Sequence, residues 1–209
     1  MKKIIFSLLL VSSITLNAQN EKYVQTMGTT LKAFGEAASA EELTALAAKF
    51  ERIGDAEKTE WLPYYYAAMI KSRLSMMGAG DKDKVADEAT AIINKAEAIS
   101  KNNSEIFCVK SMIATAKMLV DPMNRWQQYG AESTKNLNAA KAADSTNPRP
   151  YVLEATGLKS TPENFGGGCK MARPLAEKAI TLFNSKPAEN TIFPTWGKDI
   201  VEGIIKDCK

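Results

Sequence analysis

Apolar side chains recur every three to four residues along most of the chain, which is the period of an α-helix with one buried face. The pattern is clearest in residues 147–183, where two apolar stripes are separated by Pro162 and by three consecutive glycines. Both residue types interrupt helices, because proline lacks a backbone N–H and glycine loses the most backbone entropy on ordering. The segment therefore predicts two helices joined by a turn, the second beginning near Cys169.

The same pattern predicts earlier helix pairs and one final helix. The expected helices span residues 23–37, 41–53, 61–77, 83–100, 105–120, 126–143 and, opening at Phe193, 193–208. Ser39 and Glu42 are spaced as a capping box, in which each side chain satisfies a free backbone N–H of the first turn. Expected core positions include Phe107, Ile113, Leu119, Ile200, Ile204 and Ile205. With Ala, Lys and Glu abundant in these segments, the expected fold class is all-α.

Three helix endings are alike in sequence, at residues 96–103, 140–147 and 179–184. Together with the helix, turn and helix unit, they resemble a tetratricopeptide repeat. Their spacings exceed the standard repeat of about 34 residues, which implies insertions in the loops. The resemblance implies antiparallel helix pairs stacked as a short right-handed solenoid with a C-terminal capping helix. Residues 162–168, PENFGGG, resemble a loop of exported bacterial tetratricopeptide-like proteins, which implies a fold and a compartment.

The first 18 residues have the pattern of a secretory signal peptide. Lys2 and Lys3 precede a short apolar run, and a polar region ends at Ala18. The run is too short to span a bilayer. We therefore expect residues 1–18 to be removed, a single helical domain over residues 19–209, no transmembrane segment in the mature chain, and a periplasmic or secreted location.

Composition narrows the possible functions. The chain contains no His, so the commonest acid/base group and metal ligand is absent, and with it Ser-His-Asp and Cys-His catalysis. The formal net charge is +3, of which Lys2 and Lys3 supply two. A nearly neutral mature chain does not favour a nucleic-acid partner, which needs a concentrated basic face. We expect neither an enzyme, nor a metal site, nor a cofactor.

Residues 61–77 form the most aromatic segment and give the first candidate binding surface. Tyr64, Tyr65 and Tyr66 together sweep roughly 200° around a helix, so they do not all face one core. In a repeat solenoid such a helix lines the concave face, so we expect some of these side chains to face a ligand. The candidate binding residues are Trp61, Tyr64, Tyr65 and Lys71. The alternative is that the aromatic rings pack against neighbouring helices.

Two further features each allow both a binding interpretation and a purely structural one. Gly166, Gly167 and Gly168, with Lys170, predict either an anion cradle of free backbone N–H groups or a tight turn that needs positive φ angles. The nine Met residues predict either an adaptable binding surface or gap-filling between helices. The members of interest are Met69, Met76, Met77, Met112 and Met118.

Three cysteines in an exported protein leave at least one thiol unpaired. Cys169 begins one expected helix and Cys208 ends the next, and antiparallel neighbours bring such ends together. We therefore expect a disulfide between Cys169 and Cys208. Cys108 lies in an apolar helix and is expected to be an inert core residue.

The leading hypothesis is a non-catalytic exported protein that binds another protein or a peptide along its concave face. The alternative is a protein that binds a small molecule or a glycan, or a His-free enzyme, through Tyr64, Tyr65 and the turn from Gly166 to Cys169. A third possibility is a structural component of a cell-envelope assembly. Neither the partner nor the oligomeric state follows from the sequence.

Overall fold

The computed structural model describes residues 21–185 and 192–209; the predicted signal peptide, residues 1–18, lies outside this range. The described residues form helices joined by turns and short irregular segments, which confirms the all-α class. A first helix covers residues 21–36. It is followed by α2 (Ala40–Glu57), α3 (Leu62–Met77), α4 (Lys82–Ile99), α5 (Ser104–Met118), α6 (Pro122–Ala143), α7 (Arg149–Ser160), the short 3-10 helix η1 (Glu163–Phe165), α8 (Cys169–Ser185) and α9 (Lys198–Asp207).

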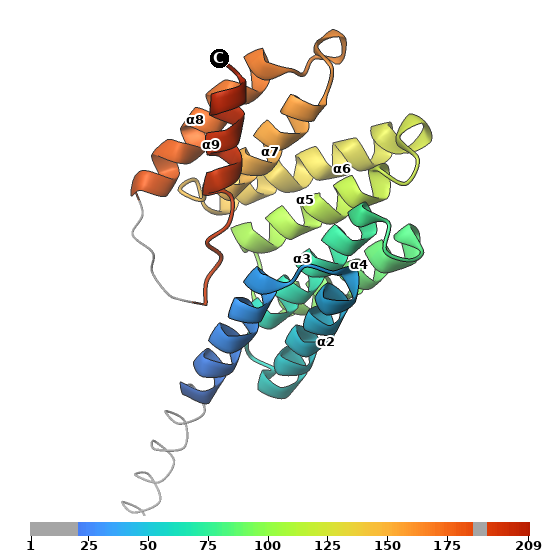
Figure 1. The fold of residues 1–209 in the computed structure, drawn as a ribbon, viewed down its shortest axis with the longest axis vertical. Helices are drawn as coiled ribbons and strands as arrows, with labels where there is room; N and C mark the ends of the chain where they lie inside the picture. The colour runs from blue at the N-terminus through green and yellow to red at the C-terminus, as the bar shows by residue number, and fades with distance from the viewer. Residues whose placement is uncertain (1–20, 186–191) are drawn as a thin grey trace, which may run out of the picture.

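The helices pack as antiparallel pairs in chain order (Figure 1). Each helix from α2 to α9 contacts the next, and α3, α5 and α7, the first helices of three pairs, also contact one another in sequence. We call the side shared by α3, α5 and α7 the inner layer. The handedness of a solenoid stays a prediction. Among the described helices, none is long and apolar enough to cross a membrane.

Local sequence signals fix several helix ends as expected. The Ser39 hydroxyl accepts from the Glu42 N–H at 3.1 Å, and the Glu42 carboxylate accepts from the Ser39 N–H at 3.0 Å. This is the predicted capping box. Because its carboxylate accepts backbone N–H groups, the pKa of Glu42 is lowered.

Two hydrophobic clusters hold the fold together. The larger joins residues 23–113 with Ile192 and is built on α3, where Tyr65 and Ile70 are completely buried. The smaller joins α7, α8 and α9 through Val152, Val201 and the small side chains of α8 at Ala172, Ala176 and Ala179. Those alanines let the three helices approach closely. Trp196 packs against both clusters and so connects the two halves of the molecule.

The structure corrects the expected last helix. It begins at Lys198 rather than at Phe193, because Gly197 adopts a left-handed φ of 110° that breaks the helical path. Val201 and Ile204 are buried on its inner side, whereas Ile200 is exposed. Leu119, expected in the core, lies just after α5 with 44% of its surface exposed. Ile113 is buried as expected.

Gly54 offers a test of packing between α2 and α3. A Cβ atom at this position would lie 2.7 Å from the Tyr64 ring. The ring is held in place, since its hydroxyl donates to Asp55 at 2.8 Å. We expect Gly54→Ala to lower the free energy of unfolding by about 1–2 kcal/mol in urea titrations, despite the better helix propensity of alanine.

Gly28 is the matched control for this substitution. It lies in the helix of residues 21–36, and a Cβ there would meet nothing within 4 Å. Gly28→Ala should therefore raise stability by about 0.5–1 kcal/mol. Equal effects of the two substitutions would contradict the close contact with Tyr64.

Candidate functional site

A buried polar centre lies where α3, α5 and α7 meet. Arg149 donates from Nη1 to Glu105 Oε1 at 2.9 Å, and Asn147 Nδ2 donates to the same oxygen at 2.8 Å. The Tyr65 hydroxyl donates to Glu105 Oε2 at 3.2 Å. Both charged side chains are nearly buried, with 11% and 14% of Arg149 and Glu105 exposed. Burial raises the pKa of Glu105, although Arg149, Tyr65 and Asn147 all stabilise its charged form.

Residues 192–197, which we call the closing segment, cover this polar centre. The Tyr66 hydroxyl donates to the Ile192 carbonyl at 2.9 Å, and Arg149 Nη2 donates to the Pro194 carbonyl. The Trp196 indole N–H donates to the Tyr65 hydroxyl at 2.9 Å. The guanidinium of Arg149 also lies 5.6 Å from the Trp196 ring. The closing segment therefore occupies the centre of the inner layer formed by α3, α5 and α7.

The candidate aromatic residues are placed mostly in the core. Tyr65 is completely buried and Tyr64 nearly so. Burial and its bond to Asp55 raise the pKa of Tyr64 to about 12. Lys71 is paired with Glu88 of α4. Trp61 is partly exposed and touches Tyr65 and, in the closing segment, Phe193. In this arrangement Tyr64 and Tyr65 pack the fold, and their proposed part in binding remains a prediction.

The glycine turn uses its own backbone N–H groups. Gly166 donates to the Glu163 carbonyl at 3.0 Å, Gly167 to Pro162 at 3.2 Å and Gly168 to Leu158 at 2.8 Å. Gly166 and Gly168 have positive φ angles, and a Cβ on Gly167 would lie 2.1 Å from the Thr161 carbonyl oxygen. These N–H groups are therefore not free to bind an anion. The geometry agrees with the tight-turn alternative, and Lys170 lies exposed beside it.

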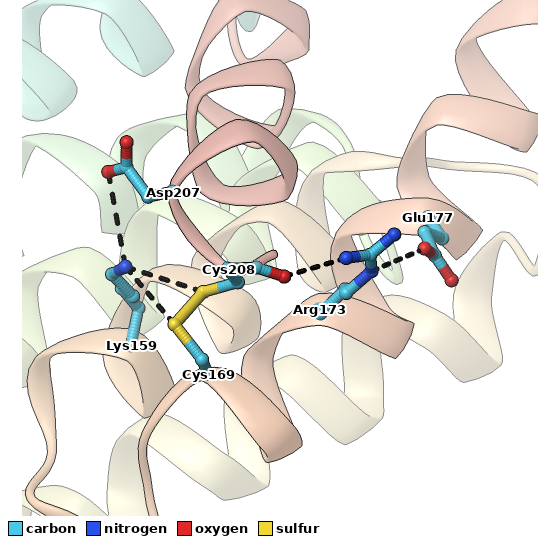
Figure 2. The surroundings of a disulfide bond; sticks show 6 residues. All are labelled: Lys159, Cys169, Arg173, Glu177, Asp207 and Cys208. Atoms are coloured by element: carbon cyan, nitrogen blue, oxygen red, sulfur yellow. Dashed lines mark hydrogen bonds and ion pairs between the residues drawn. A yellow bond between two sulfur atoms is a disulfide. The ribbon is translucent and has the colours of Figure 1, made fainter.

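The expected disulfide is present and ties the end of α9 to the start of α8 (Figure 2). The Cα atoms of Cys169 and Cys208 are 5.0 Å apart. Lys159 reaches both sulfur atoms at 3.3 Å, and Arg173 donates to the Cys208 carbonyl at 2.7 Å. Cys108 is a buried free thiol whose pKa is raised by burial, as expected for an inert core residue.

The inner face continues past the closing segment as an apolar strip. Tyr65 and Glu105 mark the inner side of α3 and α5, since both contact each other beneath the closing segment. A side chain that follows one of these residues by a whole number of helical turns lies on the same side of the helix. These include Met69 and Met76 on α3, Met112 on α5 and Leu119 just after α5, which we call the inner-face strip. Met76 and Met112 are partly exposed and Leu119 more so.

The strip ends near other exposed apolar side chains. Met123 and Trp126, at the start of α6, are 85% and 59% exposed. Met123 lies five turns before Lys141 on α6, and Lys141 contacts Glu154 of α7. The side of α6 that faces α7 is therefore covered at its C-terminal end and open at its N-terminal end. Figure 1 shows α6 and α7 diverging in that direction.

A separate polar pocket lies among α4, α5 and α6. Its volume is about 280 Å³, and its lining includes Lys110, Lys117, Lys135, Asn94 and Asn136 above Ile93 and Ile113. Lys110 and Lys117 are already paired with Glu97 and Asp87. Drug-sized ligands generally occupy larger and more apolar pockets. The inner-face strip is the better candidate for a large apolar ligand.

Sequence reasoning missed the most connected groups of this region, Glu105, Asn147 and Arg149. Glu105 looked like an ordinary first-turn acid, and Arg149 like a residue between two helix-starting prolines. Their contacts join positions about 40 residues apart, which no local pattern records.

No protein-family model matches the sequence, and no curated protein matches it. Among solved structures, the chain is similar to the HusA haemophore from Porphyromonas gingivalis, with 35% sequence identity. The similarity covers 90% of this chain and 92% of that one, with a TM-score of 0.81.

Proposed function

Because the chain belongs to the family of the HusA haemophore, we propose that it is an exported, non-catalytic protein that binds haem or a related tetrapyrrole. The observation that carries the proposal is the identity of 35% over nearly the whole of both chains. It supports the small-molecule alternative over the leading prediction of a protein or peptide partner. The apolar inner-face strip supports it further, since a flat macrocycle requires apolar contact on its faces.

The residues available for binding limit how the iron of haem is held. The chain contains no His, the axial ligand of many haem proteins. Cys108 is buried, and Tyr64, Tyr65 and Tyr66 use their hydroxyls within the fold. The described residues offer no cluster of His, Cys, Asp or Glu that could hold a metal ion. With the methionine thioethers and two further tyrosines, Tyr129 and Tyr151, as the axial ligands still open, we infer that binding rests mainly on the faces and carboxylates of the macrocycle.

The test is an absorbance titration of the mature protein with haem and, separately, with metal-free protoporphyrin. Both should bind, with dissociation constants within about tenfold of each other, which is about 1.4 kcal/mol. Binding of haem alone would contradict a mode that does not depend on iron, and would point to a methionine thioether as ligand. Failure of both ligands to bind would overturn the proposed function.

A further inference from the structure

Arg73 is a cationic side chain without an ion pair or side-chain hydrogen bond to any described residue. It is exposed on α3. Other cations of the same region are paired: Lys71 with Glu88, Lys117 with Asp87 and Arg125 with Asp83. A free guanidinium is a strong partner for a carboxylate, because its planar fork donates two parallel hydrogen bonds.

The surroundings of Arg73 are apolar. Met69, Met76 and Met77 are its neighbours on the helix surface, at four residues before and at three and four after. Across the inner layer, α3 and α5 run in the same direction, and Tyr65 contacts Glu105, 40 positions later. With the same offset of 40 positions, Arg73 on α3 lies at the height of Ile113 on α5, and Ile113 directly follows Met112. The positive charge of Arg73 thus borders the inner-face strip on α3.

We propose that the inner-face strip is the tetrapyrrole seat, with the macrocycle against the methionines and one of its carboxylates on Arg73. This inference rests on the proposed function and assigns it a place. A ligand that fits must be both broadly apolar and anionic, and a tetrapyrrole dicarboxylate is both. Methionine suits this contact, because its flexible, polarisable side chain adapts to an aromatic surface. The closing segment borders the seat on one side.

The test distinguishes the contribution of the ligand's carboxylates to binding from that of its macrocycle. Arg73→Gln and a control, Arg52→Gln, are titrated with metal-free protoporphyrin and with its dimethyl ester, delivered from the same dilute detergent. Arg52 is likewise exposed, but it lies on α2. We expect Arg73→Gln to weaken binding of the diacid about tenfold and to leave binding of the diester unchanged. Arg52→Gln should bind both ligands like the wild type.

A second variant, Met112→Gln, tests the apolar contact at nearly constant side-chain size. It should weaken diacid and diester binding alike, and circular dichroism should show unchanged helix content. If Arg73→Gln and Met112→Gln bind the diacid as tightly as Arg52→Gln, the seat is wrong while the proposed function stands. If the wild type binds no porphyrin, both fall.

Discussion

Replacing Arg149 by methionine is expected to lower the free energy of unfolding by about 3–5 kcal/mol, because it leaves the buried carboxylate of Glu105 without its cation. The substitution also removes the hydrogen bond to the Pro194 carbonyl, which anchors the closing segment. Methionine has a similar length, so the loss comes mainly from charge and hydrogen bonding. Urea titration followed by circular dichroism gives the change directly.

The double variant Glu105→Gln with Arg149→Met provides the control. With both charges absent, no unpaired ion remains buried, so the double variant should be more stable than Arg149→Met alone. Equal stability of the two variants would mean that Glu105 in the single variant finds water or a proton at little cost. The buried ion pair would then not be the source of the loss.

Removing the disulfide should have an effect of similar size. Cys169 and Cys208 are separated by 39 positions, and cross-linking a loop of that length stabilises a fold by about 4 kcal/mol in the chain-entropy model. We expect Cys169→Ser with Cys208→Ser to lose about that much stability in urea titrations. We expect α9 to detach and unfold first, since the disulfide holds its C-terminal end to α8.

Reducing agent supplies the comparison for this prediction. It should shift the urea midpoint of the wild type towards that of the double serine variant and leave the variant unchanged. Cys108 is buried and unpaired, so it does not interfere. An unchanged wild-type midpoint after verified reduction would contradict a stabilising role of the bond.

Much of the fold was predictable because its signals are local. The period of the apolar residues, the prolines at helix starts and the capping box at Ser39 depend only on neighbours within a turn or two. The disulfide followed from one further step, that antiparallel helices bring opposite ends together. Cys169 and Cys208 lie at such ends.

The candidate site was less predictable because it depends on contacts between distant segments. The sequence leaves Tyr64 and Tyr65 between a ligand-facing surface and packing against neighbouring helices, because three consecutive tyrosines exceed one core stripe. In the structure, the closing segment covers Tyr65 through Trp196, and α2 covers Tyr64 through Asp55. Conversely, Leu119 continues the apolar period of α5 yet is exposed, at the position just after the helix. Whether an apolar stripe is covered depends on the neighbouring helix, which periodicity does not reveal.

The closing segment also bears on the order in which the molecule folds. Helix pairs form from contacts between nearby residues, whereas Tyr66 meets Ile192 across 126 positions and Trp196 meets Tyr65 across 131. Contacts of such high order form late, since the entropy of closing a long loop must be overcome first. We therefore expect Glu105 and Arg149 to stay hydrated until these residues dock, and the inner face to be completed late in folding.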